Sequence, residues 1–145
     1  MEIKGELLIG SQSAQGQNRA IYAINPATNE QLLPAFHGGT AEDVDQAATL
    51  AWSTFDQFRE TTSEQRALFL EQVAEEILEL GDALINRGMA ESGLSQARLE
   101  GERGRTVNQL RLFASVVRAG NWLDVRIDTA LPERQPLPRS DLRMR

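Results

Sequence analysis

The sequence contains no cysteine, which excludes both a disulfide framework and a thiol nucleophile within its 145 residues. Its one histidine, His37, has no second histidine with which to form a metal site, and no serine or cysteine beside it to suggest a triad. The run of about 18 apolar residues that would span a bilayer is also missing. Residues 1–5 are too polar for a secretory signal. We therefore expect a cytoplasmic protein with no membrane partner.

Positive charge is scarce through most of the chain. Residues 1–125 carry 10 basic and 18 acidic side chains, whereas residues 126–145 carry 5 basic and 3 acidic ones, and the net charge is −6. Phosphate backbones are bound by basic faces, so this balance argues against a nucleic-acid partner. With 41% hydrophobic and 25% charged residues, the chain is otherwise typical of one globular domain.

The sequence does contain a regular apolar periodicity between residues 40 and 120. Apolar side chains recur there every three or four positions, which predicts amphipathic helices. N-caps at Thr40 and Thr62 begin the first two, a third covers Ala83 to Glu91, and a fourth runs from about Ser95 to Arg118. Little else in the chain is available to cover the apolar stripes, so we expect this block to pack against something larger, and we expect an oligomer.

Short extended segments flank these four helices. Residues 6–10 and 20–24 are predicted to pair as an antiparallel hairpin through a long loop, and residues 31–36 form a third extended piece. Residues 124–128 alternate in polarity, which predicts one more strand before a tail that holds three of the five prolines. We expect this C-terminal segment to be either disordered or paired with a neighbouring copy. The predicted fold is mainly α with a small β-hairpin.

Two glycines interrupt the fourth predicted helix. Gly101 and Gly104 each lower its helix propensity by about 1 kcal/mol relative to alanine. They indicate either a close approach of another helix or a ligand, or irregular first turns. They do not predict a phosphate-binding loop, because no strand leads into them and the other glycines of a dinucleotide fingerprint are missing.

Several motifs in register resemble those of one enzyme family. Five of them have the order and spacing typical of the N-terminal third of NAD(P)-dependent aldehyde dehydrogenases, namely Asn25-Pro26-Ala27-Thr28-x-Glu30, Thr40-x-x-Asp43-Val44-Asp45-x-Ala47, Ala51-Trp52-x-x-Phe55, Glu64-Gln65-Arg66-Ala67 and Glu91-x-Gly93. Three later stretches are similar to the 2,5-dioxovalerate (α-ketoglutaric semialdehyde) dehydrogenase branch of that family, namely Leu99 to Phe113, Arg126-Ile127-Asp128 and Pro136-Leu137-Pro138-Arg139-x-Asp141. The resemblance covers the whole chain.

The resemblance implies a part of a larger α/β enzyme. Residues 1–119 would be the N-terminal part of a Rossmann-type coenzyme-binding domain, and residues 120–145 the truncated start of an oligomerisation arm. The intact enzyme would be a homo-oligomer that oxidises a small-molecule semialdehyde, 2,5-dioxovalerate, to 2-oxoglutarate with NAD or NADP. The catalytic cysteine, the glutamate and the cofactor-binding motif of the family are absent from these residues. The chain alone is therefore expected to be inactive and to bind no cofactor.

The resemblance also implies that the fourth helix borders the substrate tunnel. Four of its side chains fall at i, i+3, i+4 and i+7 and so share one face: Arg105, Asn108, Gln109 and Leu112. A substrate with a distal carboxylate needs a fixed cation, and a guanidinium can bind it through two parallel hydrogen bonds. Arg105 is the candidate anchor, with Asn108 and Gln109 as orienting donors.

Simpler interpretations remain open for these and other residues. Arg103 and Arg105 could form surface ion pairs with Glu100 and Glu102, and Arg98 with Glu102. The glutamates at positions 71, 75, 76 and 79 are expected to form a solvated helix face, and the two tryptophans to be core or interface anchors. The alternative to an enzyme part is a stand-alone helical protein-interaction module without catalysis.

Overall fold

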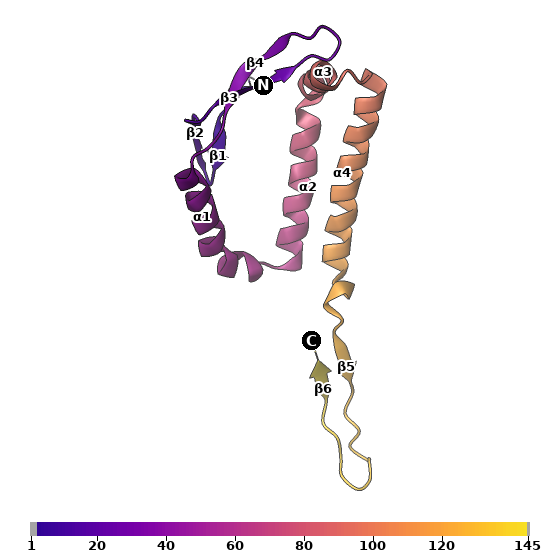
Figure 1. The fold of residues 1–145 in the computed structure, drawn as a ribbon. Helices are drawn as coiled ribbons and strands as arrows, with labels where there is room; N and C mark the ends of the chain where they lie inside the picture. The colour runs from indigo at the N-terminus through magenta and orange to yellow at the C-terminus, as the bar shows by residue number, and fades with distance from the viewer. Residues whose placement is uncertain (1–2, 145) are drawn as a thin grey trace.

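The computed structural model describes residues 3–144, in which four helices accompany three two-stranded antiparallel sheets (Figure 1). The prediction of a mainly α chain with four helices is thus confirmed. The elements in chain order are β1 Leu7–Ile9, β2 Gln12–Ala14, β3 Ala20–Ile24, β4 Gln31–His37, α1 Ala41–Arg59, α2 Ser63–Glu79, α3 Gly81–Ser92, α4 Gln96–Ala119, the 3-10 turn η1 Asn121–Leu123, β5 Arg126–Asp128 and β6 Leu142–Met144.

Local side-chain chemistry fixes where the first two helices begin. Thr40 Oγ1 accepts the Asp43 amide at 3.2 Å, and Asp43 Oδ2 accepts the Thr40 amide at 2.7 Å. Thr62 and Gln65 form the same reciprocal pair, at 3.1 and 2.9 Å. Each capping box satisfies two amides that a helix start would leave without partners. Both predicted N-caps are confirmed.

The small core lies between α2 and α4, which run side by side in opposite directions (Figure 1). α2 buries Ala67 and Ala74, and α4 buries Val107 and Ala114. Within each helix the two buried residues are seven positions apart and therefore lie on one face. Because three of the four are alanines, the two backbones approach closely.

Ion pairs across the edge of this contact fix the register of the two helices. Arg118 of α4 bonds to Glu64 at 2.7 Å and to Glu71 at 2.9 Å, and Arg111 bonds to Glu75 at 2.7 Å. Hydrogen bonds from Arg118 lower the pKa of Glu64 and of Glu71 below the usual value. Of the four glutamates predicted to form a solvated face, Glu75, Glu76 and Glu79 are exposed, while Glu71 is half-buried. Two of the four, Glu71 and Glu75, also bond to α4, which the sequence did not indicate.

The pairing of the N-terminal strands differs from the prediction. β1 pairs with β2 rather than with β3, and β3 pairs with β4. A two-residue turn is enough to reverse the chain after β1, because Gly10 takes a φ of +62°. The second reversal is stabilised by Asn25, whose side-chain oxygen accepts the Ala27 amide at 2.9 Å. Strands adjacent in sequence therefore pair with each other, and the long loop that we expected contains β2.

The C-terminal segment pairs with itself, so the expectation of a disordered tail is wrong, whereas pairing with a neighbouring copy stays a prediction. β5 and β6 form an antiparallel ribbon that extends away from the lower end of α4 (Figure 1). Leu131 and Arg139 exchange two backbone hydrogen bonds, at 2.8 and 3.0 Å. The prolines of residues 132–138 lie in the connection beyond this bridge, where no ladder amide is needed.

The glycines of the helical block have different roles. Only Leu80 separates α2 from α3, and Gly81, with a φ of +53°, is the first residue of α3. The third helix therefore begins two residues earlier than the predicted start at Ala83. Gly101 and Gly104 lie inside the continuous helix α4, and a Cβ on either would meet nothing within 4 Å. Irregular first turns are therefore excluded, and within residues 3–144 no other segment approaches these glycines.

Helix α1 buries none of its side chains. Its predicted apolar stripe is present but exposed, with Val44, Phe55 and Phe58 more than half exposed and Trp52 83% exposed. Trp122 is exposed as well, so neither tryptophan is a core residue within the described chain. None of the helices between residues 3 and 144 is long and apolar enough to cross a membrane.

Candidate functional site

The candidate substrate-binding side chains lie on the exposed side of α4. The core contact uses Val107 and Ala114, and Arg111 reaches Glu75 of α2, whereas much of the rest of α4 is exposed. The exposed residues include the four singled out from the sequence, Arg105, Asn108, Gln109 and Leu112. The helix that supplies much of the core therefore also presents the candidate site.

A shallow hollow of about 340 Å³ lies against this side of α4. It is lined by Arg105, Thr106, Gln109 and Leu110, whereas Asn108 and Leu112 do not line it. The structure therefore brings one guanidinium and one carboxamide to the same depression. Both groups are hydrogen-bond donors that suit a carboxylate ligand.

Arg105 already has one anionic neighbour. Its Nη2 atom lies 2.6 Å from Oε2 of Glu102, and the other oxygen of Glu102 lies 2.7 Å from Nη2 of Arg98. The ion pairs of Arg98 and Arg105 with Glu102 are thus confirmed, whereas Arg103 instead donates to the carbonyl oxygen of Gly81 at 3.1 Å. Because a guanidinium has five N–H donors, Arg105 retains donors for a second acceptor.

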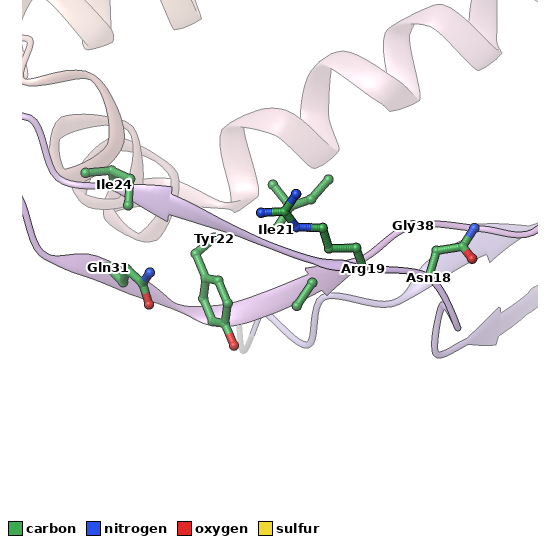
Figure 2. Close-up of a pocket in the computed structure, with 8 residues that line it drawn as sticks. Asn18, Arg19, Ile21, Tyr22, Ile24, Gln31 and Gly38 are labelled. Carbon is green, nitrogen blue, oxygen red and sulfur yellow. The ribbon is translucent and has the colours of Figure 1, made fainter.

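A second hollow, of about 610 Å³, lies along the β3–β4 sheet and was not anticipated from the sequence (Figure 2). Ile21 and Tyr22 project to opposite sides of β3, as neighbouring strand residues do. The hollow is lined by Asn18, Arg19, Ala20, Ile21, Tyr22, Ile24, Gln31 and Gly38. This lining combines one cation with apolar and amide groups and contains neither a carboxylate nor a thiol. His37, close by, bonds through Nδ1 to the Asn18 carbonyl oxygen at 3.0 Å and so has a structural partner.

The described strands do not form the parallel sheet of a dinucleotide-binding fold. All three strand pairs of residues 3–144 are antiparallel, whereas a dinucleotide site needs a parallel sheet with a glycine-rich turn into a helix. Gly101 and Gly104 lie in the interior of α4 instead of before its N-terminus. Over the same residues, no group of three or more acidic or histidine side chains could hold a metal ion.

Two of the short motifs that suggested the family meet in space. Gly93 ends α3 with a φ of +69°, and a Cβ there would come within 3.1 Å of Pro26. The turn that contains Pro26 is closed by the Asn25 amide, which donates to the Glu30 carbonyl oxygen at 2.9 Å. The glycine is thus needed both for its backbone conformation and for the close approach of this turn. Arg87 of α3 adds a bond to the Leu33 carbonyl oxygen of β4.

Comparison with known proteins identifies the family to which the chain belongs. The model of the aldehyde dehydrogenase family matches residues 12–137, and the chain belongs to that family. The chain is 50% identical over 145 residues to alpha-ketoglutaric semialdehyde dehydrogenase 2 of Azospirillum brasilense, and 43% identical over 142 residues to the alpha-ketoglutaric semialdehyde dehydrogenase of Acinetobacter baylyi. The resemblance predicted from the motifs is confirmed.

The chain spans only part of the length of these relatives. The two alignments cover 99% and 98% of this chain but 28% and 27% of the relatives. A solved structure of an NAD-dependent benzaldehyde dehydrogenase from Corynebacterium glutamicum superposes with a TM-score of 0.75, covering 92% of this chain and 28% of that one. At 23% identity this superposition supports the fold alone.

Proposed function

We propose that this chain is the N-terminal part of an aldehyde dehydrogenase that oxidises 2,5-dioxovalerate to 2-oxoglutarate with NAD or NADP. Residues 1–119 belong to its coenzyme-binding domain, of Rossmann type, and residues 120–145 to its oligomerisation arm. The observation that carries this proposal is the identity of 50% and 43%, over nearly the whole chain, to two alpha-ketoglutaric semialdehyde dehydrogenases.

The chemical step needs groups that these residues do not supply. Aldehyde oxidation in this family needs a thiolate that attacks the carbonyl carbon and an acceptor for the hydride. The chain has no cysteine, and its described strands do not form a dinucleotide cradle. We therefore expect the chain alone to be inactive and to bind no NAD(P). A fluorescence titration with NAD tests this, and micromolar affinity would contradict the domain assignment.

What this chain contributes is recognition of the far end of the substrate. Arg105 lies at the hollow on α4 with unused donors, so it can hold the carboxylate of 2,5-dioxovalerate through charged hydrogen bonds. Gln109 lines the same hollow and orients the bound group through its amide. Asn108 and Leu112 lie on the same exposed side of the helix and flank the ligand.

Substitution of Arg105 tests this assignment in the intact enzyme. Loss of a hydrogen bond to a charged group costs about 1.5–3 kcal/mol, so Arg105→Ala should raise KM for 2,5-dioxovalerate by roughly 10- to 150-fold. KM for a neutral aldehyde of the same length should hardly change. Arg111→Ala is the matched control, because Arg111 lies on α4 but pairs with Glu75. Equal effects of Arg105→Ala on both aldehydes would refute the anchor.

The enzyme is expected to act as a homo-oligomer. The ribbon of β5 and β6 projects away from the helices, and all six of its strand residues are exposed (Figure 1). A projecting two-stranded ribbon has unpaired edges that favour association with another strand. Light scattering of the intact enzyme with and without residues 120–145 would test the role of this arm.

The exposed aromatic side chains of α1 favour one second candidate, a stand-alone helical interaction module. Such a module would use Trp52, Phe55 and Phe58 to bind a partner. The coding region downstream of residue 145 discriminates between the two candidates. A dinucleotide-binding motif and a later cysteine would support the enzyme, and a stop codon would support the module.

A further inference from the structure

Three charged side chains on α4 form a continuous chain of contacts. Glu102 lies between two arginines, with one carboxylate oxygen 2.7 Å from Arg98 and the other 2.6 Å from Arg105. The side chain of Glu102 is 33% exposed, whereas that of Arg105 is 80% exposed. The carboxylate is thus the fixed member of the group, and the guanidinium of Arg105 is the one open to a ligand.

We propose that Glu102 is a specificity-determining residue, acting as a built-in counter-carboxylate that occupies Arg105 until the substrate's own carboxylate replaces it. This inference rests on the proposed role of Arg105 as the anchor. A carboxylate that approaches Arg105 meets the negative charge of Glu102 in the same hydrogen-bonding sphere. Glu102 therefore weakens binding of the anionic substrate, and it has no such effect on a neutral aldehyde.

Arg98 moderates this competition. Because it holds the other oxygen of Glu102, it prevents that carboxylate from turning both oxygens toward Arg105. It also leaves the group of three with a net positive charge, which favours an anionic ligand. Removing Glu102 and removing Arg98 should therefore change the affinity for the anionic substrate in opposite directions.

The test uses an intact enzyme that carries residues 1–145, made by replacing the matching quarter of the Azospirillum brasilense relative with this chain. Glu102→Gln should lower KM for 2,5-dioxovalerate by roughly two- to fivefold, the range of an exposed ion pair, without changing kcat. KM for a neutral five-carbon aldehyde should stay the same. Arg98→Gln should raise KM for 2,5-dioxovalerate by a similar factor.

Glu100→Gln is the matched control. It removes the same charge from the same helix, but the carboxylate of Glu100 accepts a hydrogen bond from Gln96 at 2.8 Å and is not paired with Arg105. KM for either aldehyde should therefore be unaffected. Raising the salt concentration should shrink the difference between Glu102→Gln and the unmodified enzyme, because exposed charges are screened. A purely structural role of Glu102 would not produce this salt dependence.

The outcomes separate the two proposals. If Arg105→Ala distinguishes the two aldehydes but Glu102→Gln changes KM for both equally or for neither, then the role of Glu102 is wrong and the anchor stands. If Arg105→Ala does not distinguish them, then the anchor itself is wrong. If Glu102→Gln and Arg98→Gln shift KM for 2,5-dioxovalerate in the same direction, the role of Glu102 as a counter-carboxylate is also wrong.

Discussion

Val107 provides the most direct test of the contact between α2 and α4. It is 2% exposed and is the largest of the four buried side chains at this contact. Val107→Ala removes two methyl groups, which costs about 1.6 kcal/mol in transfer free energy at about 0.8 kcal/mol each. The alanines at positions 67, 74 and 114 already bring the backbones close, so the helices cannot close the gap completely. A cavity term adds to this loss and the better helix propensity of alanine offsets part of it, so the expected loss of unfolding free energy is about 2 kcal/mol.

Urea unfolding of the chain, followed by far-UV circular dichroism, measures this loss. Val116→Ala is the matched control, since it is the same substitution in the same helix at a residue that is 41% exposed. Its effect should be below about 0.5 kcal/mol, because the better helix propensity of alanine offsets the partial loss of burial. Equal losses for the two variants would mean that the face of α4 assigned to the core is wrong.

Two further predictions concern charge and backbone conformation. The pKa values of Glu64 and Glu71 are lowered in the folded chain, so their stabilising effect is complete above the ordinary glutamate pKa of about 4.3 and is lost as the pH falls through the lowered values. Arg118→Gln should therefore flatten the fall of Tm in acid, measured by thermal unfolding against pH. Gly93→Ala should lower the free energy of unfolding by about 1–2 kcal/mol because of its positive φ, whereas Gly104→Ala should raise it by about 0.5–1 kcal/mol. Shifts of the same sign in urea unfolding would contradict the two backbone assignments.

The helices could be predicted because their signals are local. Thr40 and Thr62 mark helix starts through side chains only three residues further along, and the stripe that contains Val107 repeats within one helix. The strands were harder to predict. The sequence of Gln12–Ala14 is polar and its side chains are exposed, so nothing in its pattern indicates that it pairs with β1.

The ion pairs of α4 show the same division between local and distant contacts. The pair of Arg98 and Glu102 follows from i, i+4 spacing. The bonds from Arg118 to Glu64 and Glu71 join residues 54 and 47 positions apart, and only the register of α2 against α4 brings them together. No periodicity in the sequence carries that information, so the ion pairs of Arg118 could not be predicted.

The same long-range contacts determine how the proposed anchor is held. α4 is tied in its first half by Arg103, which donates to the Gly81 carbonyl oxygen, and at its end by Arg118, which binds two glutamates of α2. These two ties, with Val107 buried between them, oppose rotation of α4 about its axis. Arg105 therefore has a backbone of fixed orientation, and its side chain is exposed and held only by the pair with Glu102. A movement of α4 would break both ties and expose Val107. A ligand therefore binds by replacing Glu102 as the partner of the Arg105 guanidinium, while the helix stays in place.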